Sequence, residues 1–275
     1  MELHERIYEL ALTRSFFYPS NEIYGQVSGF YDYGPTGWQV KRRLQELWRR
    51  MFLQEGGHLE VESSIVTPEI VLKASGHVEE FTDPVVECMQ CHSKIRADHL
   101  VESKMEFKWD GKLETITAKV RDNDIKCPSC GGKVSDAFFS NLMFRTGIGA
   151  DQETAYLRPE TAQGIFTSFP RVFRNHGAKL PLAVGQIGKS FRNEISPRRG
   201  LVRMREFTQM ELEYFFNPKM PTIEGFGKVR KEKVRLLTRE AQAEGGAPQW
   251  VSAEGMVEKG IANEIMAYYL VKEWE

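Results

Sequence analysis

VGQIGKSFRNEISPRRGLVRMREFTQMELEYFF, residues 184–216, indicates the fold more strongly than any other stretch of this 275-residue sequence. Val184 to Glu194 predicts a β-strand, and Leu201 to Phe216 predicts a second, longer strand. Between them, Ser196-Pro197-Arg198-Arg199-Gly200 has the residues typical of a turn. The three segments together predict an antiparallel hairpin.

The second strand of this hairpin would carry chemical groups on one face. Side chains alternate across a strand, so a regular strand over residues 203–213 separates two sets. One set is largely apolar, with Glu206 as an exception, and is expected to face the core: Met204, Thr208, Met210, Leu212 and Tyr214. The other set is Arg203, Arg205, Phe207, Gln209, Glu211 and Glu213. On the first strand, Arg192 and Glu194 share a face.

Such a face suits a nucleotide together with an amine. Arginine guanidinium groups match phosphate oxygens, and a phenyl ring offers a stacking surface for a base. A carboxylate further along the strand can accept hydrogen bonds from an ammonium group. The alternative interpretation is a solvated outer face with incidental charges, which one strand does not exclude.

The four cysteines form two pairs with the same spacing. They lie in Cys88-Met89-Gln90-Cys91 and in Cys127-Pro128-Ser129-Cys130, which is followed by two glycines. Two residues between thiolates let one turn present both sulfurs to one ion, so four thiolates predict a closed, structural Zn²⁺ site. Two disulfides, unrelated thiols and a redox pair are the alternatives, and the glycine-rich second knuckle favours a zinc ribbon over them.

Composition describes a globular protein with no overall basic charge. Apolar residues make up 41% and charged residues 27%, and the net charge is −1. Any nucleic-acid contact would therefore come from a local patch. No apolar run reaches the roughly 18 residues of a membrane helix. Residues Met1 to Arg6 lack an apolar secretory core, so the sequence predicts a cytoplasmic protein without membrane contact.

Periodicity predicts the remaining elements. Val40, Leu44, Leu47, Trp48 and Met51 recur at helical spacing, so a helix is expected from an N-cap at Thr36 to Gly56-Gly57. A strand is expected from Leu59 to Val66, ending near Pro68, and another from Glu114 to Val120. Residues 222–240 are predicted to be helical, and a final helix is expected from about Ala253 through Tyr268.

Several longer strings resemble a known family. Phe191-Arg192-Asn193-Glu194 and Arg203-Met204-Arg205-Glu206-Phe207 resemble motif 2 of class II aminoacyl-tRNA synthetases, F-R-x-E, a loop, then R-x-x-x-F. The other strings resemble the glycyl-tRNA synthetases: residues 28–35 (SGFYDYGP), 75–81 (SGHVEEF), 96–99 (RADH), 157–164 (LRPETAQG) and 209–213 (QMELE). The resemblance covers essentially the whole chain and points to the homodimeric type with an archaeal-like zinc insertion.

The resemblance implies an α+β fold, in which a class II antiparallel sheet, incomplete here, is flanked by helices and carries a small zinc-ribbon-like insertion. Residues 1–84 would form the core with motif 1, residues 85–135 the zinc-binding insertion, and residues 136–275 the core with motif 2. Motif 1, the helix at 36–55 and the strand ending at Pro68, implies a homodimer interface. From the residues alone, that helix is an ordinary amphipathic core helix.

The family activates glycine with ATP and Mg²⁺ as glycyl-adenylate and transfers it to the 3′ end of tRNA(Gly). By resemblance, Arg192 and Glu194 would be catalytic, Arg192 holding the α-phosphate, Arg203 reaching the γ-phosphate side and Phe207 stacking on adenine. Glu194 would contact the nucleotide or the tRNA terminus. The implied ATP-binding set is Arg192, Asn193, Glu194, Val202, Arg203, Met204, Arg205, Glu206 and Phe207. The implied glycine-binding set is Arg96, Glu160, Phe207, Gln209 and Glu211. The implied metal ligands are Cys88, Cys91, Cys127 and Cys130.

Two of these residues have ordinary alternative interpretations. Arg96 could be a surface cation that pairs with Asp98. Glu160 could be a first-turn acid that stabilises the helix following Pro159.

The sequence departs from the family at its end. Motif 3, G-x-G-x-x-R, has one superficial match at Gly225 to Arg230, which lies in a charged stretch and is rejected. No anticodon-binding domain follows. We therefore expect an N-terminal catalytic portion that is active with a separate C-terminal half. The alternative is a synthetase-derived module, without catalysis, that binds adenylate, a partner subunit or RNA.

Overall fold

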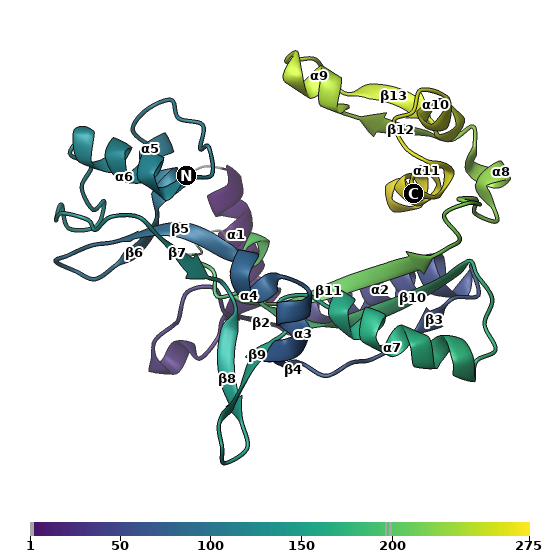
Figure 1. Ribbon diagram of the computed structural model, residues 1–275, viewed down its shortest axis with the longest axis horizontal. Helices are drawn as coiled ribbons and strands as arrows, with labels where there is room; N and C mark the ends of the chain where they lie inside the picture. The colour runs from purple at the N-terminus through teal and green to yellow at the C-terminus, as the bar shows by residue number, and fades with distance from the viewer. Residues whose placement is uncertain (1–2, 196, 198–199) are drawn as a thin grey trace. The chain divides into compact units, whose positions relative to one another are not determined.

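The computed structural model describes residues 3–195, 197 and 200–275, so most of the predicted turn at residues 196–200 lies outside the described residues. The chain forms two compact units (Figure 1). The first comprises residues 1–44, 62–164 and 187–210, and the second comprises residues 45–61, 165–186 and 211–275. Each unit is described by itself below.

The first unit opens with helix α1 (Leu3–Thr13) and a two-stranded antiparallel sheet of β1 (Phe17–Pro19) and β2 (Tyr31–Tyr33), with a short helix, η1 (Glu22–Tyr24), between the strands. Helix α2 (Pro35–Trp48) begins at Pro35 and not after an N-cap at Thr36, because proline is well suited to a first helical position. A Cβ on Gly37 would lie 1.9 Å from the Phe16 carbonyl oxygen, so only glycine allows this approach.

A three-stranded antiparallel sheet lies in the same unit, in the order β4 (Val66–Pro68), β9 (Glu153–Leu157) and β8 (Phe144–Ile148). Helices α3 (Glu69–Ala74) and α4 (His77–Glu80) lie between β4 and the insertion in sequence. Leu72, Met143 and Tyr156 form the buried cluster here, with Val78 and Phe81 packed against it.

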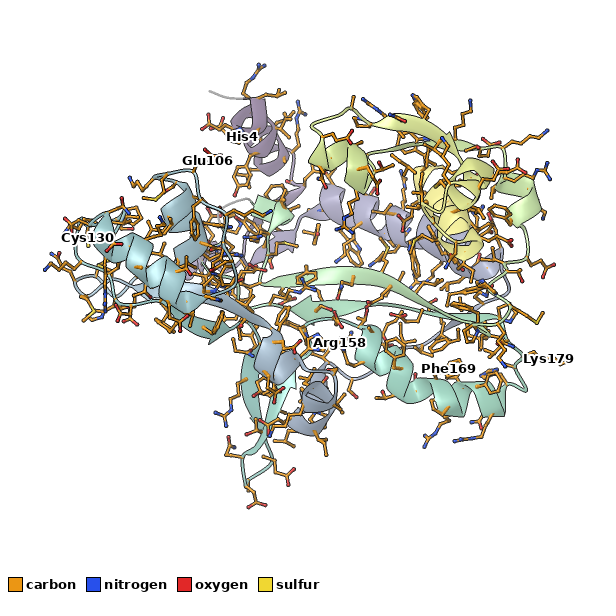
Figure 2. The ribbon with its side chains drawn as sticks, turned by 45° about the horizontal axis from the view of Figure 1, so that its top comes forward. His4, Glu106, Cys130, Arg158, Phe169 and Lys179 are labelled. Carbon is orange, nitrogen blue, oxygen red and sulfur yellow. The ribbon has the colours of Figure 1, made fainter. Side chains whose placement is uncertain are left out.

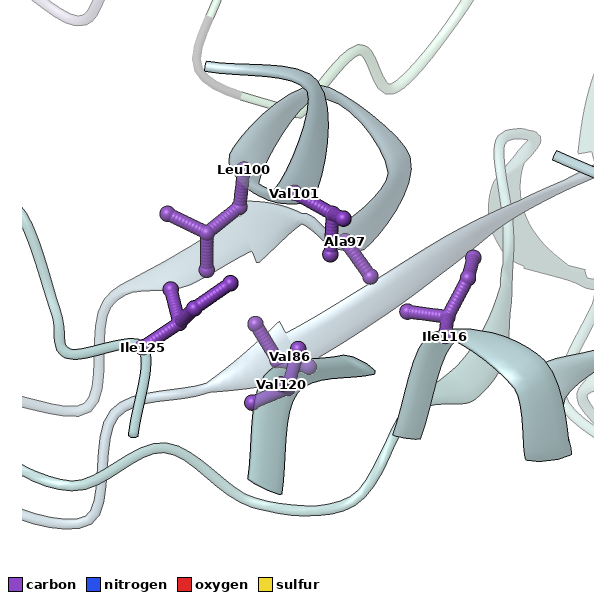
Figure 3. Close-up of a cluster of buried hydrophobic side chains, with 7 residues drawn as sticks. All are labelled: Val86, Ala97, Leu100, Val101, Ile116, Val120 and Ile125. Carbon is purple, nitrogen blue, oxygen red and sulfur yellow. The ribbon is translucent and has the colours of Figure 1, made fainter. Parts of the chain in front are cut away.

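Residues 82–141, which include the predicted insertion, contain a core of their own. Strands β6 (Lys94–Arg96), β5 (Thr82–Glu87) and β7 (Phe138–Asn141) form an antiparallel sheet in that order. Helices α5 (Ala97–Glu102) and α6 (Leu113–Asp122) cover one face of it (Figure 1). The strand predicted over 114–120 is wrong, because Ile116 and Val120 lie one helical turn apart and are both buried. The cluster they join is shown in Figure 3: Val86, Ala97, Leu100, Val101, Ile116, Val120 and Ile125.

The hairpin around residue 200 is confirmed, with shorter strands than expected. Strand β10 (Leu182–Phe191) is hydrogen-bonded to β11 (Glu206–Phe215), and β3 (Leu59–Glu60) pairs in parallel on the other side of β10. The prediction that the second strand begins at Leu201 is wrong, because a 3-10 turn, η3 (Gly200–Val202), precedes it. Arg203 and Arg205 therefore lie before the strand. The single strand predicted from Leu59 to Val66 is likewise interrupted between β3 and β4.

The second unit contains a π-helical segment, η2 (Arg49–Gln54), and helix α7, whose bounds are Ala162–Asn175. Its aromatic packing includes the Phe169 and Phe215 rings, stacked with centroids 3.6 Å apart. Ile165, Leu182 and Val184 form the buried cluster of this region.

Residues 222–275 build a further small core in the second unit. Antiparallel strands β12 (Lys233–Leu236) and β13 (Gln249–Ser252) pack with α10 (Ala253–Glu258) and α11 (Glu264–Trp274), and two short helices, α8 (Phe226–Val229) and α9 (Arg239–Ala243), complete it. The prediction of a helix over residues 222–240 is wrong, because Val234 and Leu236 lie in strand β12, which pairs with β13. The final helix is interrupted at Gly260, whose φ is 65°.

The class of the fold agrees with the prediction, α+β with mainly antiparallel sheets. Among the described residues, no helix has both the length and the apolar character needed to cross a membrane.

Candidate functional site

Arg192 lies over two aromatic rings just after β10. Its guanidinium carbon lies 5.4 Å from the centroid of the Phe81 ring and 5.4 Å from that of the Phe207 ring. Arg192 Nε donates a hydrogen bond of 3.1 Å to the Pro159 carbonyl oxygen. Within the described part of the chain, the two terminal amino groups of Arg192 have no hydrogen-bond acceptor. The guanidinium is therefore fixed while its outer donors stay available to a ligand.

The backbone beyond β10 is fixed by short hydrogen bonds. Asn193 N donates to the Leu142 carbonyl at 2.6 Å, and Glu194 N donates to the Arg192 carbonyl at 2.7 Å. The Glu194 carboxylate forms an ion pair with Arg203, Oε2 to Nε, at 3.6 Å. The cation and carboxylate that the sequence singled out are thus neighbours in space.

Arg205 is committed to backbone oxygens. Its guanidinium donates twice to the Glu194 carbonyl, at 3.1 and 2.9 Å, and once to the Ser28 carbonyl at 2.8 Å. Its own N–H donates to the carbonyl of Gly29, at 2.8 Å. Burial lowers the pKa of Arg205, although the guanidinium stays charged. Arg205 therefore ties the loop at residues 28–29 to the motif 2 loop, and its contact with ATP stays a prediction.

Two lysines support the start of β11. Lys189 Nζ lies 2.6 Å from Glu206 Oε1, and Lys41 Nζ donates to Thr208 Oγ1 at 2.7 Å. Burial, and then the nearby Lys189 charge, lower the pKa of Lys41. Glu206 therefore has a lysine partner within this chain. On either side of Arg203, Val202 is 83% exposed and Met204 is buried, in keeping with the apolar face expected for Met204.

Glu160 is oriented by two side chains. Gln163 Nε2 donates to Glu160 Oε1 at 2.6 Å, and His77 Nε2 lies 3.4 Å from the same oxygen. The other ring nitrogen of His77 shares a 2.9 Å hydrogen bond with Ser75 Oγ. Because α7 begins at Ala162, Glu160 precedes the helix and its carboxylate is directed by these partners.

Gln209 carries an unused acceptor. Its Oε1 is buried and, among the residues that the structure describes, receives no hydrogen bond. An unsatisfied buried acceptor costs about 1–3 kcal/mol, so such an atom is typical of a site that a ligand completes. Glu211 follows two residues later on β11 and belongs to the second unit.

Arg158, labelled in Figure 2, is a buried clamp directly after β9. Its Nε donates to the Lys189 carbonyl at 2.7 Å, and its Nη1 donates to the Ser63 carbonyl at 2.8 Å. The Phe191 N–H in turn donates to the Arg158 carbonyl at 2.9 Å. This clamp fixes β10, and hence Arg192, against the preceding segment.

Arg96 forms ion pairs with two aspartates, Asp98 and Asp83. Its Nη2 lies 2.5 Å from Asp98 Oδ2, and its Nη1 lies 3.2 Å from Asp83 Oδ2. Burial raises the pKa of Asp83. Burial also opposes ionisation of Asp98, but hydrogen bonds from Arg96 and the His99 N–H outweigh it, so the pKa of Asp98 is lowered. Arg96 pairs with Asp98 as the alternative interpretation expected, yet its side chain is only 20% exposed.

A cationic cavity of about 590 Å³ lies beside this arginine. Among the described residues, its lining contains four cationic or imidazole side chains and no carboxylate. The lining residues are Ser93, Lys94, Ile95, Arg96, His99, Pro128, Ser129, Ile195, Val202 and Arg203. The insertion and the motif 2 loop thus share one cationic surface in the first unit.

The four cysteines form a single cluster. Cys88 and Cys130 have sulfurs 3.4 Å apart, those of Cys91 and Cys127 are 3.7 Å apart, and all four lie within 4.8 Å of one another. These distances exclude disulfides, whose sulfurs lie about 2.05 Å apart. A tetrahedral zinc with roughly 2.3 Å bonds to sulfur requires separations of this size. The cluster can therefore hold one metal ion.

Comparison with known proteins agrees with this geometry. Residues 144–240 match the family described as tRNA synthetase class II core domain (G, H, P, S and T). A glycine–tRNA ligase of Methanothrix thermoacetophila is 45% identical over all of this chain, and one of Pyrococcus abyssi is 48% identical over 98% of it. The matched regions make up 48% and 47% of those relatives.

The chain is a homologue of the glycine–tRNA ligases. It spans about half the length of the curated relatives it matches. The class II glycine–tRNA ligase resemblance predicted from the motifs is thereby confirmed, and the match at residues 144–240 includes the whole motif 2 hairpin.

The structure adds residues to those that the ligase motifs predict. Phe81 contacts Arg192, and His77 contacts Glu160. Lys41 contacts Thr208. Phe81 and His77 lie in the string at residues 75–81, which carried the resemblance without any assigned role. Sequence spacing gives no signal for these contacts, because each joins segments that are distant in the chain.

Proposed function

We propose that this chain carries the glycine-activating site of a glycine–tRNA ligase, an AMP-forming aminoacyl-tRNA ligase. The arrangement of Arg192 is the main support. Phe81, Phe207 and the Pro159 carbonyl fix its guanidinium, and its terminal amino groups have no acceptor among the described residues. A planar, preorganised cation with free donors suits an α-phosphate.

In the first step, a glycine carboxylate oxygen attacks the α-phosphorus of ATP. A new P–O bond forms, the bond to the β-phosphate oxygen breaks, and pyrophosphate leaves with its electron pair. Arg192 stabilises the charge that develops on the α-phosphate oxygens, and Phe207 offers a ring face to adenine. Mg²⁺ accompanying ATP supplies further neutralisation of phosphate charge. Positioning and electrostatics carry this step, without a protein nucleophile.

Glycine recognition requires acceptors for an ammonium group and no space for a larger side chain. The buried Gln209 Oε1 and the oriented Glu160 carboxylate supply such acceptors. From the family motif, we also assign Glu211 to glycine binding. We also assign Arg96, which is paired with two aspartates, to glycine binding.

In the second step, a hydroxyl of the terminal tRNA ribose attacks the carbonyl carbon of glycyl-adenylate. The ester bond forms, the bond between the carbonyl carbon and the phosphate oxygen breaks, and AMP leaves, while the proton of the hydroxyl passes to the phosphate or to solvent. We assign Arg203 to the γ-phosphate side during activation and Glu194 to the nucleotide or the tRNA terminus. Their 3.6 Å ion pair keeps both side chains at the edge of the motif 2 loop.

We assign Zn²⁺ to the cluster of Cys88, Cys91, Cys127 and Cys130. Backbone N–H groups of Gln90 and Ser129 point at cysteine sulfurs, at 3.5 and 3.4 Å, which favours thiolates. Four protein thiolates leave no open position, so the ion would stabilise the insertion and take no part in the reaction.

The proposal includes the partners of the whole enzyme. The region matched here makes up about half of each relative. We propose that the remaining functions, motif 3 and anticodon binding, belong to the part of the relatives that this chain does not span, and that the protein works as a cytoplasmic homodimer.

A non-hydrolysable glycyl-adenylate analogue, with a sulfamate in place of the phosphate, tests this function. Calorimetry should show that the glycyl analogue binds at least about tenfold more tightly than the alanyl analogue, because the pocket excludes a methyl group. Equal affinity for both would contradict glycine selectivity. Failure to bind either one would favour a non-catalytic module.

A further inference from the structure

We propose that Phe81 is a positioning residue, which holds the Arg192 guanidinium in the orientation that receives the α-phosphate. This inference rests on the proposed function, because it gives Arg192 the phosphate as its ligand. It adds a residue outside motif 2 to the activation step.

Phe81 can hold another residue in place because it is itself anchored. Its N–H donates to the His77 carbonyl at 3.3 Å, and its carbonyl accepts from the Leu142 N–H at 3.0 Å. The side chain packs against the buried cluster that contains Leu72 and Met143. The ring therefore packs against a buried core, and the guanidinium carbon of Arg192 lies 5.4 Å from its centroid.

Two rings restrain a guanidinium better than one. An arginine side chain has many rotamers, and ordering it costs free energy when a ligand binds. Contacts with two aromatic rings restrict tilting, while the bond from Nε to Pro159 restricts rotation of the guanidinium. The terminal N–H groups stay unused. Phe81 thus lets Arg192 bind phosphate at a low entropic cost.

Phe207 alone would be a poor support. The proposed function uses this ring for adenine, and a phenyl ring has two faces. If Arg192 keeps one face, adenine takes the other, and any shift of Phe207 toward the base loosens its contact with Arg192. Phe81 contacts no proposed ligand atom, so it holds the cation whether or not nucleotide is bound.

The test compares two variants at this position. Phe81→Leu retains apolar volume for the cluster but removes the aromatic face, and Phe81→Tyr retains both. Phe139→Leu is the matched control, because Phe139 is a half-exposed ring on β7 of the same unit. All three are compared with the unsubstituted chain by thermal unfolding and by calorimetric titration with AMP and with adenosine.

Adenosine lacks the phosphate, so the ratio of the two affinities reports the contact with Arg192. We expect Phe81→Leu to reduce the advantage of AMP over adenosine by about tenfold, which corresponds to roughly 1.4 kcal/mol. Its affinity for adenosine should stay within twofold, on the order of experimental error. Phe81→Tyr and Phe139→Leu should leave the ratio unchanged.

An unchanged ratio in Phe81→Leu would overturn the proposal. So would an equal loss in Phe81→Leu and Phe81→Tyr with a lowered unfolding temperature, since that pattern indicates a purely structural residue. Loss of AMP preference in Phe81→Leu, in a chain that does not select glycyl-adenylate over the alanyl analogue, would uphold Phe81 and contradict the proposed function. Absence of AMP binding by the unsubstituted chain would overturn both.

Discussion

Residues of one type take different roles here according to what surrounds them. Among the described residues, Arg192 has no acceptor for its terminal donors, Arg205 binds carbonyl oxygens, and Arg158 is a buried clamp between segments. The sequence identified all three as part of recognisable strings and could not distinguish their environments. Only long-range contacts, such as those of Arg205 with Ser28 and of Arg158 with Ser63, separate a structural arginine from one that is free to bind phosphate.

Substituting Arg192 should therefore mainly affect activity, whereas substituting Arg205 should mainly affect stability. Arg192→Gln should reduce ATP–pyrophosphate exchange by at least about 100-fold and lower the unfolding free energy by only about 1 kcal/mol, because within the protein it loses one hydrogen bond, to the Pro159 carbonyl, and its contacts with two rings. Arg205→Gln should lower the unfolding free energy by about 2 kcal/mol, because carbonyls lose a charged donor. Exchange kinetics and urea unfolding of both variants check this. Equal loss of stability in the two would contradict the separation.

Gln209 offers a test of glycine recognition. Gln209→Met has a similar volume and removes the buried acceptor. We expect the KM for glycine to rise by about tenfold, since one hydrogen bond to a charged group is lost, while the KM for ATP stays the same. Steady-state exchange kinetics measure both constants. A rise in the KM for ATP alone would place Gln209 at the nucleotide and not at the amine.

The stability that Asp98 contributes through its ion pair with Arg96 should depend on pH. Its pKa is lowered in the folded state, so its contribution to stability is present above the unfolded value and is lost as pH falls through the folded value. Asp98→Asn should cost about 2 kcal/mol at pH 7, and the difference from the unsubstituted protein should narrow below about pH 4. Urea unfolding across this range is the measurement. A difference that is constant with pH would show that the charge of Asp98 contributes nothing.

At the scale of elements, the sequence predicted the elements whose pattern was regular and missed those that tertiary packing decides. The hairpin and the first part of α2 follow from alternation and helical spacing. The apolar residues of segment 114–120 fit both the alternation of a strand and the spacing of a helix. The segment forms a helix because Ile116 and Val120 then reach the core of the insertion. The charged run at 222–240 contains a strand, because Val234 and Leu236 fill the core that α11 covers.

The insertion therefore has two sources of stability, an apolar core and a cysteine cluster. Metal analysis should find about one zinc per chain if all four thiolates bind a single ion. Cys127→Ser should abolish zinc binding and increase amide hydrogen exchange at 88–91 and 127–132, while α5 and α6 keep most of their protection. Full protection in a metal-free protein would contradict the zinc assignment.

At the scale of the molecule, the chain contains a motif 2 site but only half the length of its relatives. Class II membership followed from short strings that lie far apart in the sequence. The contacts of Phe81 and His77 could not be derived from them, because folding brings residues 77–81, 158–160 and 192–207 together. The central claim is that this assembled site activates glycine.

Glycine-dependent ATP–pyrophosphate exchange tests that claim most directly. The chain is assayed alone and together with a polypeptide that spans the remaining half of a relative such as the Pyrococcus abyssi ligase. Exchange should appear in the mixture with glycine, be absent with alanine, and disappear when the chain carries Arg192→Gln. The absence of glycine-dependent exchange both alone and in the mixture would contradict the account.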